Sequence, residues 1–158
     1  MSRVGDPDRV EAVYRSIHPR LWRSLFAYTG SAELASDAEA EAFAQVLSRG
    51  DAVEDVAAWV WRSAFRIASG LLATRSRRSN EVPSAQAETR PTDSIAEFMA
   101  LLGDLSSQQR ACVALRYVGN DKPPEIGELL GTSASVVRVQ LHRAHTALRH
   151  TIVEVDHA

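Results

Sequence analysis

Residues 105–149 read LSSQQRACVALRYVGNDKPPEIGELLGTSASVVRVQLHRAHTALR, and this stretch decides the fold. Gly131, Thr132 and Ser133 lie between two runs of apolar residues at helical spacing. Glycine can take the left-handed conformation that ends a helix, and threonine or serine can cap the next one. The stretch therefore predicts a helix-turn-helix with a supporting helix in front of it.

The first helix of this motif is short and has a defined start. Pro123 and Pro124 favour a helix that begins at about Pro124, because proline at a first helical position lacks only an N–H that would be unpaired there. Gly127 is small where the second helix must cross closely. The apolar face of this helix consists of Ile126, Leu129 and Leu130.

The second helix of the motif has two different faces. One stripe repeats at i, i+4, i+7 and i+11 and is expected to face the core: Val137, Leu141, Ala144 and Leu148. The opposite stripe carries Ser135, Arg138, Val139, His142, Thr146 and Arg149, with Arg143 at its edge. Residues 133–150 contain no acid, so this face suits a groove lined by phosphates. The alternative is that the arginines only solvate an exposed helix.

Several motifs follow one another in a single register: Gln109-Arg110, Leu115-Arg116-Tyr117, the run from Glu125 to Gly131, Arg143-Ala144 and Leu148-Arg149. Together they resemble region four of bacterial RNA polymerase sigma factors. The resemblance implies that the last helix reads the minus-thirty-five element as duplex DNA in the major groove.

Roles within that helix follow from side-chain chemistry. Arg138 and Arg143 are the candidates for base edges, since arginine can grip guanine through two acceptors. Val139 and His142 share the groove-facing side, while Gln140 and Arg149 are expected to touch the DNA backbone. Ser133 and Ser135 are expected to meet a phosphate at the positive end of the helix.

The organisation of the chain indicates two modules. Residues 79–94, SNEVPSAQAETRPTDS, contain one large aliphatic residue, two prolines and no period, which is typical of a flexible linker. We therefore expect an all-α fold of two small helical domains, residues 1–78 and 95–158, joined by residues 79–94.

The N-terminal half predicts three helices. The first carries an apolar face from Val10 to Tyr28 and is expected to bend or break at Pro19 before Gly30 closes it. The second, about residues 31–48, has an acidic polar face formed by Glu33, Asp37, Glu39 and Glu41. The third, about residues 55–75, is followed by a basic run and contains Gly70, which lowers helix stability by about 1 kcal/mol relative to alanine.

This half contains a second series of motifs: Tyr14 with residues 18–21, Asp37 with Glu41 and Phe43, and Ala58-Trp59 with Arg62, Ala64, Ala68 and the run 75–78. These residues resemble region two of the compact extracytoplasmic-function class of sigma factors. The resemblance implies that Asp37, Glu41 and Phe43 contact core RNA polymerase. It also implies that the third helix captures the minus-ten element as the DNA melts.

Aromatic and basic side chains suit that second task, because aromatic rings stack on unpaired bases and arginines hold phosphates. Trp59 and Trp61 point to different sides of a helix, so one of them is expected to be exposed, and Trp61 is the candidate for stacking. The arginines expected at the minus-ten element are Arg62, Arg66, Arg75, Arg77 and Arg78.

Other chemistry is weakly represented. Cys112 lies in an apolar run and is expected to pack as a small hydrophobe. His142 and His145 have helical i, i+3 spacing, but two histidines without further ligands make a weak metal site. We expect no cofactor, no metal and no catalytic activity. No apolar stretch approaches the length of a membrane segment, so membrane insertion is not expected and the cytoplasm is the expected compartment.

Three functions remain open from the residues. The favoured one is a promoter-specificity subunit that acts on promoter DNA when bound to core RNA polymerase. The alternative is an autonomous helix-turn-helix transcription regulator with an N-terminal sensing or dimerising module. A small enzyme is the least supported, since no catalytic constellation is visible. Membership of the class also implies an anti-sigma factor as a partner.

Overall fold

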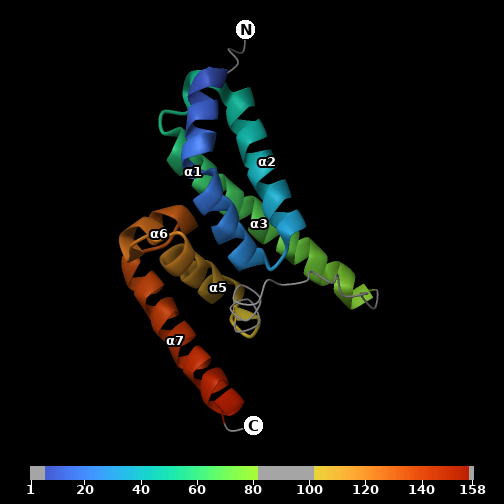
Figure 1. Cartoon of the computed structure of the whole chain (residues 1–158), viewed down its shortest axis with the longest axis vertical. Helices are drawn as coiled ribbons and strands as arrows, with labels where there is room; N and C mark the ends of the chain where they lie inside the picture. The colour runs from blue at the N-terminus through green and yellow to red at the C-terminus, as the bar shows by residue number, and fades with distance from the viewer. Residues whose placement is uncertain (1–5, 82–101, 157–158) are drawn as a thin grey trace. The chain divides into compact units, whose positions relative to one another are not determined.

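The computed structural model describes residues 6–81 and 102–156, with side chains described for residues 6–78 and 102–150. The chain divides into two compact units, Met1–Gln86 and Ala87–Ala158. In both units the described residues form helices and contain no strand (Figure 1). The predicted all-α fold is confirmed. Residues 79–81 of the predicted linker form the end of a helix, and its remainder lies outside the described residues.

The N-terminal unit consists of three packed helices, α1 (Pro7–Thr29), α2 (Ala32–Arg49) and α3 (Val56–Glu81). Each helix contacts the other two, and a short 3₁₀ turn, Gly50–Ala52, follows α2. Leu21, Leu25, Val46 and Val60 are fully buried between them. Burial of these aliphatic side chains supplies the main favourable free energy of folding for this unit.

The ends of α1 and α2 follow local capping rules. Oδ1 of Asp6 accepts a hydrogen bond from the Asp8 N–H, and Gly30 ends α1 with a φ of 70°. The Ser31 hydroxyl then caps α2 by accepting from the Leu34 N–H. Of the bend or break predicted at Pro19, the break is excluded, because α1 continues through this residue. Ile17 and Leu21 are buried on either side of it, which offsets the loss of one backbone hydrogen bond.

Among the described residues of the C-terminal unit, α5 (Ser107–Val113) continues as a π-helical segment, Ala114–Val118. The helices α6 (Pro123–Leu130) and α7 (Ala134–Asp156) follow. A reciprocal capping box starts α5: the Ser106 hydroxyl accepts from the Gln109 N–H, and Oε1 of Gln109 accepts from the Ser106 N–H. The core consists of Leu102, Val113, Leu115, Ile126 and Val137.

Cys112 belongs to this core. Its side chain is fully buried, and burial raises the pKa of its thiol to about 11. A thiol with that pKa stays protonated at neutral pH, and the thiolate is the nucleophilic form. The prediction that Cys112 packs as a small hydrophobe is confirmed.

None of the helices in the described parts of the chain is long and apolar enough to cross a membrane.

Candidate nucleic-acid interface

The turn between α6 and α7 is tight and has the predicted residues at its critical positions. Gly131 has a φ of 72°, and the N–H groups of Gly131 and Thr132 both donate to the Gly127 carbonyl oxygen. The Ser133 hydroxyl caps α7 by accepting from the Val136 N–H. A Cβ on Gly127 would lie 2.7 Å from the Thr132 carbonyl oxygen. The predicted need for a small residue at this crossing is confirmed.

The faces of α7 are divided as the sequence predicted, except that Leu148 is only half-buried. Val137, Leu141 and Ala144 are buried against the rest of the unit. We use the term basic face for the exposed residues Ser135, Arg138, Val139, His142, Arg143, Thr146 and Arg149. Ser133, just before the helix, is also exposed. The predicted minus-thirty-five residues therefore lie together on one solvent-facing side, with Gln140 at its border.

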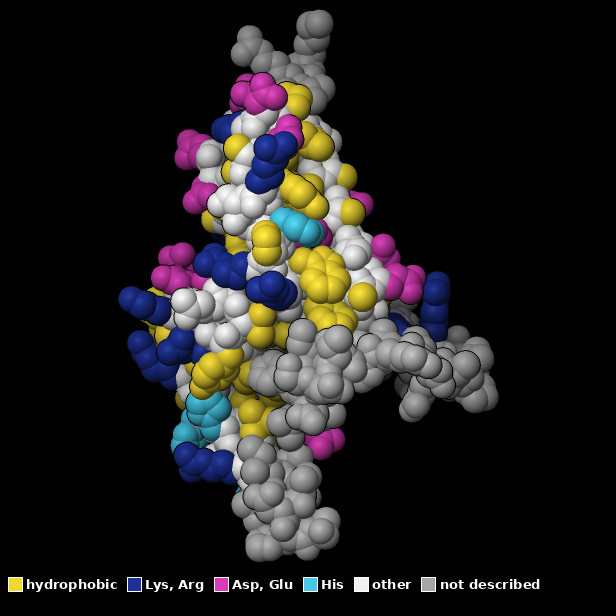
Figure 2. All heavy atoms as spheres, in the orientation of Figure 1, with side chains coloured by type: hydrophobic (Ala, Val, Ile, Leu, Met, Phe, Trp, Pro, Cys, Tyr) yellow, Lys and Arg dark blue, Asp and Glu magenta, His cyan; other side chains and the backbone are white. Residues whose placement is uncertain are grey.

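The charge of the basic face is uncompensated. Residues 134–150 include no acid, and none of Arg138, Arg143 and Arg149 takes part in an ion pair within the described part of the chain. Figure 2 shows arginine or lysine and histidine side chains following one side of α7. Free guanidinium groups at this density are suited to phosphate oxygens.

Two side-chain contacts border the basic face. Gln140 is half-buried and donates from Nε2 to Oε1 of Gln108 on α5, at 3.2 Å. This bond restrains the predicted DNA-backbone contact at Gln140. On the other side, the Tyr117 hydroxyl bonds Nε2 of His145. Sequence reasoning missed this pair, since the two residues are 28 positions apart and belong to different helices.

The predicted polymerase contacts on α2 are only partly exposed. Asp37 and Glu41 face solvent. Phe43 is 8% exposed, and its ring packs edge-on against Tyr14 with 5.1 Å between ring centres. A role for Phe43 as a surface contact is contradicted, because its ring fills the space between α1 and α2.

Of the two tryptophans of α3, Trp59 is the more exposed, whereas the sequence predicted exposure for Trp61. Trp61 is 4% exposed, stacks on Phe65 and is covered by the Arg20 guanidinium, so the prediction that it stands exposed for base stacking is wrong. Trp59 is half-buried, with the Arg49 guanidinium 5.3 Å from its ring centre. The predicted minus-ten arginines are all exposed: Arg62, Arg66, Arg75, Arg77 and Arg78.

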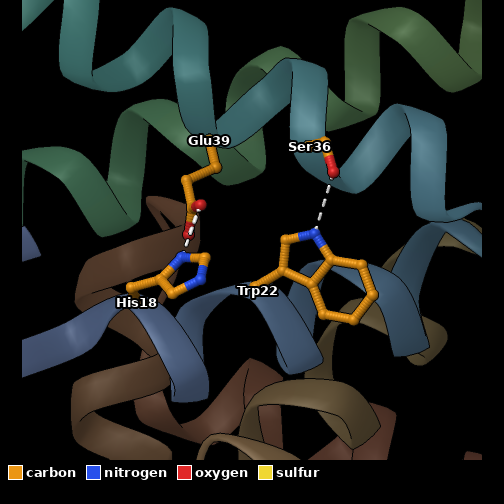
Figure 3. Close-up of polar contacts among 4 residues, drawn as sticks. All are labelled: His18, Trp22, Ser36 and Glu39. Carbon is orange, nitrogen blue, oxygen red and sulfur yellow. Dashed lines mark hydrogen bonds and ion pairs between the residues drawn. The ribbon is translucent and has the colours of Figure 1, made fainter. Parts of the chain in front are cut away.

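A polar contact between α1 and α2 was also missed (Figure 3). The prediction that Glu39 belongs to the solvent-facing acidic side of α2 is wrong, because this residue is 5% exposed and its carboxylate meets His18. One helical turn along α1, the Trp22 indole donates to the Ser36 hydroxyl at 3.1 Å (Figure 3). These contacts fix α2, and with it Asp37 and Glu41, against α1.

The described residues contain no group of three side chains suited to holding a metal ion.

Comparison with known proteins agrees with this geometry. Residues 95–148 match the family described as sigma-70, region 4. The RNA polymerase sigma-E factor of Streptomyces coelicolor is 35% identical over 89 residues, which cover 52% of this chain and 50% of that protein. The chain thus matches about half the length of this curated relative.

Two solved structures share the fold. One is CnrH in complex with the cytosolic domain of CnrY, with a TM-score of 0.73 and 18% identity, covering 95% of this chain and 91% of that one. The other is the sigma factor RpoE with the anti-sigma factor NepR from Bartonella quintana, with a TM-score of 0.75 and 14% identity, covering 92% and 97%.

The turn at Gly131, the basic face of α7 and the family match define the C-terminal unit as a sigma-70 region 4 domain of the helix-turn-helix class. The family match is confined to residues 95–148, and the two solved structures, at 18% and 14% identity, extend the likeness beyond this domain as a shared fold.

Proposed function

We propose that this chain binds core RNA polymerase and directs promoter-specific transcription initiation, by recognising and melting the minus-ten element and reading the minus-thirty-five element. The observation that carries the proposal is the basic face of α7, exposed and free of acids directly after a tight turn, within the residues that match region 4. A helix of this kind enters the major groove with its first turns.

Within that proposal, Arg138 and Arg143 read base edges, with Val139 and His142 beside them. Arg149 and Gln140 contact the DNA backbone, and Ser133 and Ser135 meet a phosphate at the start of α7. All of these side chains except the half-buried Gln140 are exposed to solvent, which supports these roles.

Charge separates the two tasks of the N-terminal unit. Asp37 and Glu41 face solvent on α2 and are proposed to dock on the polymerase. Five exposed arginines on α3, Arg62, Arg66, Arg75, Arg77 and Arg78, are proposed to hold phosphates of the melting minus-ten strand. Opposite charges on neighbouring helices direct the polymerase and the DNA to different sides of this unit.

Regulation by an anti-sigma factor is part of the proposal. The Bartonella quintana RpoE structure was solved with the anti-sigma factor NepR, and the CnrH structure with the cytosolic domain of CnrY. We further propose that the protein works in the cytoplasm as a binding subunit without catalytic activity. Two separate domains, joined by a linker that starts after α3 ends at Glu81, complete the proposal.

Charge reversal on α2 tests the polymerase contact. The double variant Asp37→Lys/Glu41→Lys should no longer co-purify with core RNA polymerase, because a cationic side chain at each position reverses the charge offered to the partner. Glu54→Lys is the matched control, since Glu54 is an exposed acid outside α2, and it should co-purify like the unaltered protein. Equal recovery of polymerase by the double variant and the control would contradict the assignment.

A further inference from the structure

Tyr117 and His145 form a fixed pair on the surface of the C-terminal unit. The Tyr117 hydroxyl lies 2.5 Å from Nε2 of His145, and the two ring centres are 5.7 Å apart. Tyr117 is 53% exposed, and His145 is exposed as well. Burial of apolar surface therefore does not account for the pair, and its effect is to restrict the imidazole orientation.

The pair lies beside the basic face of α7. At 100° per residue, His145 is next to Arg138, seven residues before it, and Arg149, four residues after it. His145 is also about 15 Å along the helix axis from Ser135, at 1.5 Å per residue. The major groove is about 12 Å wide, so when the first turns of α7 lie in the groove, His145 reaches its phosphate-lined edge.

The hydrogen bond with Tyr117 leaves one imidazole nitrogen available. When the Tyr117 hydroxyl donates to Nε2, the neutral ring of His145 carries its hydrogen on Nδ1, and the protonated ring carries one there too. Nδ1 is thus a donor in both charge states. A donor held at the edge of a cationic surface is suited to a phosphate oxygen.

The charged surroundings of His145 are mainly positive. On α7 they are Arg138 and Arg149, with His142 one turn before. From the π-helical segment, Arg116 lies over the Tyr117 ring at 5.8 Å, and α5 and this segment contain no acid. The acids of α6, Glu125 and Glu128, are exposed. An anion bound at His145 therefore meets the positive charges of Arg138 and Arg149 on the same side of α7.

We propose that His145 contacts a DNA phosphate through Nδ1 at the edge of the groove and that Tyr117 is the positioning residue that orients its ring. The inference deepens the proposed function, on which it rests, by adding two residues to the DNA interface.

The test uses the full chain and a labelled duplex of about 20 base pairs of arbitrary sequence, since a phosphate contact is independent of sequence. Fluorescence anisotropy is measured over a range of salt concentrations at neutral pH. His145→Gln should lower the affinity about fivefold and reduce the salt slope. Tyr117→Phe, which removes only the hydroxyl, should lower the affinity about twofold to fivefold.

Tyr14→Phe is the matched control, because it removes an exposed hydroxyl from the other unit and should leave binding unchanged. Affinities and salt slopes of His145→Gln and Tyr117→Phe equal to those of the unaltered protein would overturn the inference, as would a failure of the unaltered protein to bind the duplex at low salt. Initiation with core polymerase is scored separately: if it persists while the variants bind normally, only the inference fails, and if it is absent, the proposed function fails.

Discussion

Nδ1 of His18 on α1 lies 2.7 Å from Oε1 of Glu39 on α2, while Oε2 of Glu39 is buried with no hydrogen-bond partner. Burial raises the pKa of the Glu39 carboxyl, and the charge and hydrogen bond of His18 only partly oppose this rise. The pair therefore connects the two helices while leaving the ionised carboxylate incompletely satisfied.

The pH dependence of stability follows from the sign of this shift. Because the pKa of Glu39 in the folded protein is above its ordinary value of 4.5, its stabilising contribution is complete below that value and is lost as the pH rises through the folded pKa. Glu39→Gln removes this loss, so the variant should melt a few degrees higher at about pH 7, with a smaller difference at about pH 4. Thermal denaturation followed by tryptophan fluorescence measures the melting temperature at both pH values.

The exposed Glu41 on the same helix provides the comparison, and Glu41→Gln should leave the melting temperature nearly unchanged at both pH values. A Glu39→Gln protein that melts well below the unaltered one at neutral pH would mean that the ion pair with His18 outweighs the burial of its charge.

Replacement of two glycines by alanine should change stability in opposite directions. A Cβ at Gly127 meets the Thr132 carbonyl oxygen at 2.7 Å, so Gly127→Ala should destabilise the C-terminal unit by about 1–3 kcal/mol. Gly70 has open space around it inside α3, so Gly70→Ala should stabilise the N-terminal unit by about 0.5–1 kcal/mol.

Spectroscopy separates the two units, because all three tryptophans, Trp22, Trp59 and Trp61, belong to the N-terminal one. Tryptophan fluorescence should detect the Gly70 effect, and far-UV circular dichroism, which reports on both units, should detect the Gly127 effect. Similar melting of Gly127→Ala and the unaltered protein would show that α6 and α7 can separate at little cost.

The two neighbouring tryptophans of α3 should also differ. Trp61→Ala removes a buried ring packed on Phe65 and should lower the free energy of unfolding by about 3–5 kcal/mol. Trp59→Ala removes a half-buried ring under Arg49 and should lower the free energy of unfolding by about 1 kcal/mol. Urea denaturation followed by circular dichroism compares them, and equal midpoints for the two variants would contradict the burial of Trp61.

Substitution on the basic face should separate DNA reading from polymerase binding. Arg138→Ala or Arg143→Ala should lower promoter-specific transcription, because each removes a candidate base contact worth about 1–3 kcal/mol. Co-purification with core polymerase should be unchanged, as both side chains are exposed on α7. Arg15→Ala, an exposed arginine of α1, is the control for a general charge effect. Loss of polymerase binding by either α7 variant would contradict the division of roles.

Much of the helix-turn-helix could be predicted because its determinants are local. Val137, Leu141 and Ala144 repeat at the helical period, which fixes the opposite face of α7. The conformation of Gly131 and the close approach at Gly127 likewise follow from residues within one turn.

The missed features depend on contacts between helices. Periodicity places Glu39 beside the buried Ala38 and Ala42 but does not show that His18, 21 residues earlier, lies opposite its carboxylate. Alternation with Trp59 predicts that Trp61 is exposed, yet the buried Val60 and Ala64 flank it and Arg20 of α1 covers it. The motif around Phe43 does not show its burial, which depends on Tyr14 of α1.

Run-off transcription with purified core RNA polymerase tests the central claim most directly. DNA fragments that the polymerase transcribes only with this protein are selected from a genomic pool, and the transcript is measured with and without the protein. We expect transcription from a discrete start site that requires both the protein and core polymerase. Arg138→Ala should reduce the amount of this transcript. Specific binding of the protein alone to DNA, with no initiation from any fragment in the presence of core polymerase, would contradict the central claim.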